Sequence, residues 1–336
     1  MTAVEPAIDQ ATSQGPLARL AADPWVRFVA RRVGRLVVSM WVLITASFLM
    51  IRLIPGDPVR AALGMTAPPA LVAATREALG LDDPLWVQYV DYLRDLLSGD
   101  LGASMISKLP VADVIAQRLP ATLQLAFLAF IVAVAVAVPL GVVMGVLTRH
   151  GRRRRTELGF TTTSVVLGTI PDIIVGVVLV YVFAVGLDWV PVAGRSGPDS
   201  YVLPVIALAI GPAVILARLL RVEMVKVLEA DFIRTARAKR LPARVIYLRH
   251  ALPNALTASL TVAGLLLSSL VAATVLVENV FAWPGLGGTL VGSILDKDYL
   301  MVQALVLVYG TFALLVNLGV DVILALLDPR SLIRQD

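Results

Sequence analysis

Residues 229–254 read EADFIRTARAKRLPARVIYLRHALPN. This basic, helix-forming stretch separates two charge-free apolar runs, residues 200–217 and 251–277. Each run can form a helix of about the 20 residues that cross a bilayer. Loops between membrane helices are rarely so long, so charged and so regularly helical unless a soluble protein binds them. The stretch therefore indicates a polytopic membrane protein with a soluble partner.

The composition of the whole chain agrees with the membrane class. Hydrophobic residues make up 58% of its 336 residues and charged residues 16%, and the mean hydropathy is +0.84. Soluble domains carry about 25% charged residues. The chain has no cysteine and only two histidines, His150 and His250. This excludes disulfides, iron–sulfur clusters and Cys- or His-rich metal sites, so we expect no metal in this chain.

Six apolar segments have the length of membrane helices. They are longer than the strands of a membrane β-barrel and lack the alternation of apolar and polar residues that such strands show. They comprise residues 36–54, 121–148, 158–187, 200–217, 251–277 and 299–320. The first follows an arginine-rich tail and has no clean cleavage site after it, so we expect an uncleaved helix rather than a signal peptide. The fold class is all-α, a polytopic membrane protein with six transmembrane helices.

The basic residues predict the orientation in the membrane. If both termini are cytoplasmic, 21 of the 29 lysines and arginines face the cytoplasm. This bias is the positive-inside signal and predicts an N-in, C-in topology. It also accounts for the formal net charge of +5 without nucleic acid as a partner.

Between the first two spans lies a polar segment, residues 55–120, which we expect to form a small external cap. Within it, residues 86–97 have helical spacing, with Trp86, Tyr89, Val90, Leu93 and Leu97 on one stripe. This stripe suits either the membrane surface or packing against the bundle. The predicted domains are a tail (1–35), the first span (36–54), the external segment (55–120), a five-helix core (121–327) with a cytoplasmic loop (223–254), and a second tail (328–336).

Three adjacent spans contain helix breakers. They are Pro139 and Gly141, Gly168 and Pro171, and Pro204, Gly211 and Pro212. Such residues are tolerated where neighbouring groups or water satisfy the freed backbone. They favour a moving or water-lined core, and close packing through small residues is the alternative.

Within the basic loop, residues 231–239 predict a short helix with Asp231 at its N-terminus and basic residues at its C-terminus. Leu241 and Pro242 end it, and residues 243–250 predict a second short helix. Ile233, Ala236 and Leu241 form an apolar knob that a groove on the soluble partner would bury.

The loop also resembles a known family, the permeases of ATP-binding-cassette (ABC) importers. Their loop carries the pattern Glu-Ala-Ala, three residues, Gly, nine residues, Ile, one residue, Leu-Pro. Here Arg234-Thr235-Ala236 stands at the first position, Arg240 at the Gly, His250 at the Ile and Leu252-Pro253 at the end. This variant is similar to the peptide and nickel branch. Other segments resembling that branch are residues 52–58, 79–89, 99–102, 118–122, 189–191, 280–287 and 328–330.

Arg240 departs from the family pattern. Glycine at this position permits a left-handed helix terminus, which costs energy for arginine. We therefore expect Pro242 to set the turn instead.

The resemblance implies a type I importer permease in the bacterial inner membrane, paired with a second permease. It further implies two ATPase subunits, which bind ATP and magnesium, and an extracytoplasmic peptide-binding protein. No cofactor is expected in this chain, which is not itself an enzyme and has no G-x-x-x-x-G-K-[ST] phosphate loop. The residues implied for ATPase coupling are Arg234, Thr235, Ala236, Arg237, Ala238, Lys239, Arg240, Leu241, Leu252 and Pro253.

Candidates for the substrate pathway are Asp172 with the neighbouring Pro171 in the third span, and Glu278 and Asn279 at the end of the fifth. A charge inside a membrane helix usually faces a cavity or a partner. Asp172 could meet the ammonium group of a peptide or pair with an arginine. Glu278 could instead be an interfacial carboxylate that needs no partner, and Asp321 is expected to pair with a basic residue.

The function predicted from the sequence is import of di- or oligopeptides by alternating access, driven by ATP. A permease for nickel or another small solute has the same motifs and stays open as an alternative. A secondary transporter is the alternative from a different class. It would need coupling-ion carboxylates near the midplane, where only Asp172 qualifies. No histidine lies in a predicted span, which argues against an intramembrane enzyme.

Overall fold

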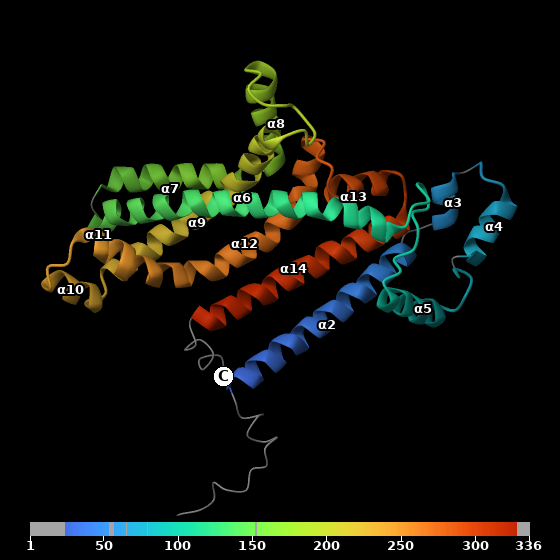
Figure 1. Ribbon diagram of the computed structural model, residues 1–336, viewed down its shortest axis with the longest axis horizontal. Helices are drawn as coiled ribbons and strands as arrows, with labels where there is room; N and C mark the ends of the chain where they lie inside the picture. Colours follow the sequence, from blue (N-terminus) through green and yellow to red (C-terminus); the bar gives the residue numbers. More distant parts are fainter. Residues whose placement is uncertain (1–23, 54–56, 65, 79, 152, 328–336) are drawn as a thin grey trace, which may run out of the picture.

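The computed structural model describes residues 24–53, 57–64, 66–78, 80–151 and 153–327 (Figure 1). The predicted tail 328–336 and residues 1–23 of the first tail lie outside the described residues. Five helices within the described ranges are long and apolar enough to cross a membrane. They are α2 (Pro24–Leu53), α6 (Val111–Thr148), α9 (Val202–Leu228), α12 (Leu252–Val280) and α14 (Tyr299–Leu327).

The predicted span 158–187 is a bent pair rather than one helix. It consists of α7 (Arg154–Thr169) and α8 (Asp172–Leu179), which continues as a π-helical turn, Val180–Gly186, and the two halves meet at 92°. Proline has no N–H to donate into α7, and the Pro171 carbonyl instead accepts from Ile174 and Val175 at 2.9 and 3.2 Å. Six spans result if this pair is one of them.

The close contact between α6 and α9 organises the bundle. Gly141 and Gly145 of α6 lie against α9, where an added Cβ would stand 2.8 Å from Leu220 Cβ and 2.6 Å from Met224 Cβ. Ala129, Ala133 and Ala137 on α6 are buried as well. Small residues let helix backbones approach in a membrane. For Gly141, the close-packing interpretation of the predicted breakers is therefore confirmed.

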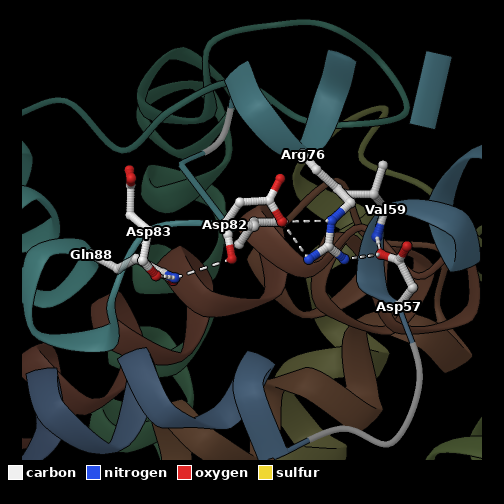
Figure 2. A network of polar contacts seen from close by, with 7 residues as sticks. Asp57, Val59, Arg76, Asp82, Asp83 and Gln88 are labelled. Carbon is white, nitrogen blue, oxygen red and sulfur yellow. Dashed lines mark hydrogen bonds and ion pairs between the residues drawn. The ribbon is translucent and has the colours of Figure 1, made fainter. Parts of the chain in front are cut away.

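The external segment contains three short helices, α3 (Pro58–Leu63), α4 (Pro69–Ala78) and α5 (Leu85–Ser98). Helix α5 confirms the helix predicted at 86–97. Figure 2 shows the polar network that joins these helices: Arg76 contacts Asp82 at 2.7 Å and Asp57 at 3.4 Å. The Asp57 carboxylate also accepts from the Val59 backbone N–H at 3.0 Å, which caps α3.

One face of α5 packs on α2. The hydroxyls of Tyr89 and Thr45 are 2.8 Å apart, and the Tyr89 ring lies edge-on to Phe48. Arg52 Nη2 donates to Gln88 Oε1 at 2.6 Å. The opposite face of α5 remains exposed, including Trp86, Val90 and Leu97. The packing interpretation therefore holds for Tyr89, while Trp86, Val90 and Leu97 point away from the bundle.

A buried carboxylate joins the external segment to α14. Asp298, just before α14, accepts from the Ser104 hydroxyl and, at 3.1 Å, from the Met105 backbone N–H. At the other end of the bundle, Arg32 of α2 forms an ion pair with Asp321 of α14. This confirms the predicted pairing of Asp321. The start of α2 and the end of α14 thus lie together, at the end opposite α3–α5 (Figure 1).

Replacing Gly145 with Ala tests the α6–α9 contact. The new Cβ has no room beside Met224, so we expect overpacking to lower the free energy of unfolding by about 1–3 kcal/mol. The measurement is the midpoint of thermal unfolding in mild detergent. Gly159→Ala on α7 is the control, because no atom lies within 4 Å of the added Cβ. Equal melting temperatures for the two variants would contradict the close contact.

Candidate functional site

The basic loop folds as a compact unit at one end of the bundle (Figure 1). Helix α10 (Asp231–Ala238) follows α9 after two residues and confirms the helix predicted at 231–239. The second predicted helix, 243–250, is different. Only α11 (Ala243–Val245) is α-helical, and a π-helical turn, Ile246–Ala251, runs directly into α12.

The apolar knob of the loop is buried within this chain. Ile233 is fully buried and Ala236 nearly so. They pack in one cluster with Leu228 at the end of α9 and with Ile246 and Ala251 of the π-helical turn. The expectation that a soluble partner buries this knob is therefore wrong for Ile233 and Ala236. The π-helical turn brings the start of α12 under α10 and closes the cluster.

The outer face of α10 is cationic and exposed. Arg234, Thr235, Arg237, Ala238, Lys239 and Arg240 are all exposed. Phe232 adds an aromatic side chain that is 46% exposed. Arg237 also donates to the Leu228 carbonyl at 3.3 Å, so it stabilises the loop itself. Of the other predicted coupling residues, Leu241 and Leu252 are half-buried and Pro253 is exposed.

Arg240 adopts the left-handed conformation that the sequence argument considered costly, with φ 56°. Its N–H donates to the Arg237 carbonyl at 2.9 Å, and the Leu241 N–H donates to the Ala236 carbonyl at 3.3 Å. These two bonds form a Schellman motif. The expectation that Pro242 sets the turn is wrong, because the two hydrogen bonds and the packing of Leu241 hold Arg240 in place.

Asp172 lies at the break between α7 and α8. It is in the first turn of α8, after Pro171. A Cβ added at Gly211 of α9 would stand 3.7 Å from Asp172 Oδ1, and Pro212 follows in the same helix. The breakers of two spans thus meet around one carboxylate. Within the described residues, this half-buried carboxylate has no hydrogen bond or ion pair.

Glu278 and Asn279 do not share a site. Asn279 is exposed, and its amide donates to the Val275 carbonyl at 2.7 Å. Glu278 is fully buried and accepts from the Gly287 backbone N–H at 2.6 Å, in the first turn of α13 (Leu286–Leu295). The interfacial interpretation of Glu278 is therefore wrong. Its carboxylate caps a helix inside the protein.

Glycines make room for this cap. A Cβ at Gly285 would stand 2.4 Å from the Glu278 carboxyl group, and one at Gly287 would stand 2.8 Å from Glu278 Oε2. Thr122 of α6 accepts from the Leu286 N–H at 2.8 Å and ties the same turn to the bundle. The sequence signal that could have revealed the cap is the Trp-Pro-Gly-Leu-Gly run five residues after Glu278.

The chain matches known proteins over most of its length. Residues 137–333 match the family described as "Binding-protein-dependent transport system inner membrane component", and residues 25–126 match its N-terminal family. The chain belongs to this family. It is a type I ABC importer permease of the peptide and nickel branch and a multi-pass inner membrane protein. The family is the membrane component of such importers and not their ATPase subunit.

Among its relatives are the glutathione transport system permease proteins GsiC of Escherichia coli K12, Shigella dysenteriae and Salmonella typhi. Each is 36% identical over 304 residues, which cover 90% of this chain and 98% of the relative. The fold is similar to a solved chain of the MetNI methionine ABC transporter. The TM-score is 0.55 at 19% identity, covering 64% of this chain and 96% of that chain.

Arg240→Gly tests the strained turn after α10. Glycine adopts φ 56° without the strain that arginine has, but it also raises the conformational entropy of the unfolded chain. We expect the first effect to be larger, so that the variant is more stable by about 0.5–1 kcal/mol. The measurement is amide hydrogen exchange at Arg240 and Leu241, which should slow. Lys239→Gly is the control, since Lys239 has an ordinary φ of −74°, and it should speed exchange. Faster exchange in Arg240→Gly would show that the arginine side chain itself holds the turn.

Glu278→Ala tests the cap on α13. It leaves the buried Gly287 N–H without its acceptor, which costs about 1–3 kcal/mol, and opens a cavity as well. We expect a lower melting temperature and a lower yield of folded protein. Asn279→Ala, at the adjacent exposed position, should have little effect. Full stability of Glu278→Ala together with lost transport would contradict the capping role and favour substrate contact.

Proposed function

We propose that this chain is the permease of an ATP-driven importer of di- or oligopeptides and forms half of the translocation pathway. The coarse assignment, an ABC importer permease, follows from the family. The peptide class is supported by the similarity to glutathione permeases, because glutathione is a tripeptide. The proposed partners are a second permease, two ATPase subunits that carry ATP and magnesium, and an extracytoplasmic peptide-binding protein.

The exposed cationic face of α10 is the observation that supports coupling between the ATPase subunits and the membrane helices. Because Ile233 and Ala236 are buried within the loop, α10 is already held in place before a partner binds. An ATPase that contacts Arg234, Thr235 and Ala238 can therefore move the ends of α9 and α12 with it. In this mechanism, ATP binding and hydrolysis bias the bundle between outward-open and inward-open states, since a ligand shifts such an equilibrium only through differential affinity.

This mechanism assigns the N-in, C-in orientation, with α10 on the cytoplasmic side and α3–α5 outside. The positive-inside bias of the basic residues supports it. Asp172, beside Pro171 and next to Gly211, is the candidate for contact with the peptide ammonium group, because its half-buried carboxylate has no partner among the described residues.

Arg234→Glu tests the coupling. Arg234 is exposed, and among the described residues its side chain pairs only with Asp231, in a local ion pair at 3.2 Å, so the charge reversal should leave folding intact. In the assembled complex, we expect peptide-stimulated ATP hydrolysis and uptake to fall at least about tenfold, as loss of a charged interface contact costs about 2 kcal/mol or more. The measurement uses proteoliposomes with labelled glutathione and dipeptides, and with nickel as an alternative solute.

Arg155→Glu is the matched control, because this exposed arginine lies at the same end of the bundle on α7. It should transport normally. Normal uptake by a correctly assembled Arg234→Glu complex would contradict the coupling role. Uptake of nickel but not of peptides would contradict the peptide assignment and leave the coupling role standing.

A further inference from the structure

A groove of about 300 Å³ lies between α2, α12 and α14, at the end of the bundle where α2 begins and α14 ends (Figure 1). Close helix contacts hold its walls. Gly264 of α12 packs against Val320 of α14, and Gly310 of α14 packs against Leu43 of α2, in each case without room for an added Cβ. The groove is lined neither by Asp172 nor by any residue of α10, so it is separate from the sites described above.

The charged residues that line this groove sum to one positive charge. They are Arg32 and Arg35 of α2 and Asp321 of α14. Arg32 and Asp321 form an ion pair, so together they contribute no net charge. Arg35 is exposed and has no hydrogen bond or ion pair in the described part of the chain. Its guanidinium group, which can donate several hydrogen bonds at once, is therefore available to an anion.

Three uncharged donors line the same groove. Ser39 lies one turn after Arg35 on α2, Asn317 lies one turn before the end charge of α14, and Thr261 belongs to α12. The hydroxyls of Ser39 and Thr261 form no hydrogen bond among the described residues. Asn317 accepts from the Ser268 hydroxyl at 3.0 Å through Oδ1, which leaves its amide N–H groups to donate elsewhere. The groove therefore offers several unused donors beside one unpaired arginine.

Farther along the helices the lining of the groove becomes apolar. Leu314 lies three residues beyond Asn317 toward the middle of α14, and Leu265 lies four residues beyond Thr261 toward the middle of α12. The Leu265 side chain is 58% exposed. Donors near the helix ends, followed by apolar side chains toward the middle of the spans, match the order of headgroup and acyl chain in a bilayer leaflet. A free phosphate would use only the polar part of the groove.

We propose that this groove binds the phosphate of an anionic phospholipid, such as phosphatidylglycerol, from the leaflet at this end of the bundle. The phosphate oxygens accept hydrogen bonds from Arg35, Ser39 and Thr261. The Asn317 amide supplies a further donor, and an acyl chain lies along Leu265. The single positive charge favours a headgroup with net negative charge over a zwitterionic one. The site is independent of which solute the permease transports.

The experiment titrates short-chain lipids into the full chain in a mild non-ionic detergent and counts bound lipid by native mass spectrometry. Dioctanoyl phosphatidylglycerol is compared with dioctanoyl phosphatidylcholine, which has the same phosphodiester but no net charge. Glycerophosphoglycerol, the headgroup without its acyl chains, is titrated separately. We expect one saturable phosphatidylglycerol, with an apparent Kd at least about fivefold lower than that of phosphatidylcholine. Glycerophosphoglycerol should bind at least about tenfold more weakly than the lipid, because it buries no apolar surface.

Two variants test the residues of the groove. Arg35→Gln should raise the apparent Kd for phosphatidylglycerol about fivefold or more and remove the preference over phosphatidylcholine, because one positive charge beside the phosphate is lost. Thr261→Val keeps the shape of the side chain without its hydroxyl and should raise the Kd for both lipids about threefold. Arg155→Gln is the matched control. It removes an exposed arginine at the same end of the bundle that does not line the groove, so the Kd should not change.

The proposal is overturned if Arg35→Gln binds phosphatidylglycerol as tightly as the unchanged chain does. It is also overturned if Arg155→Gln weakens binding as much as Arg35→Gln, since that result would indicate attraction by the general positive charge of this end of the bundle. Equal affinity for glycerophosphoglycerol and the lipid would contradict the role of the apolar wall and overturn the assignment to a phospholipid. Because Arg35 and Thr261 are exposed, both variants should fold, and their melting temperatures without added lipid verify this.

Discussion

Backbone N–H and C=O groups that leave a helix inside a membrane have no water to bind, and this constraint decides where the chain interrupts its helices. The Pro171 carbonyl accepts the Ile174 and Val175 N–H groups in the first turn of α8. The Glu278 carboxylate and the Thr122 hydroxyl accept the first N–H groups of α13. At both interruptions the protein itself accepts some of the freed N–H groups, and each interruption brings a carboxylate, Asp172 or Glu278, to a position that lipid could not support.

The same constraint separates the two carboxylates by role. Glu278 is enclosed by glycines and accepts a hydrogen bond from the backbone of α13, so it stabilises the fold. Asp172 stands next to Gly211 with its oxygens unpaired among the described residues. A carboxylate that has no hydrogen bond or ion pair among the described residues, and that lies where the broken span faces Gly211 of α9, is available for a ligand. Position in the sequence alone could not separate these cases, since both residues end or break an apolar run.

Much of the fold could be predicted because each membrane helix corresponds to a long run of apolar residues in the sequence. The runs located α2, α6, α9, α12 and α14, and the basic loop located α10. Features that depend on contacts between distant residues could not be found this way. The Arg240 turn needs the packing of Leu241, and the burial of Ile233 needs the π-helical turn before α12.

The burial of Ile233 changes how motion can pass through the protein. A loop that folded only on its partner would spend part of the binding energy on ordering. Here the cluster of Leu228, Ile233 and Ile246 already joins α10 to the ends of α9 and α12. Since α9 is also in tight contact with α6 along Gly141 and Gly145, we expect a displacement of α10 to move α6, α9 and α12 together. Gly211 and Pro212 lie within the continuous helix α9, where it faces the broken span, and we propose that this is where that body bends, because a proline inside a helix removes one backbone hydrogen bond.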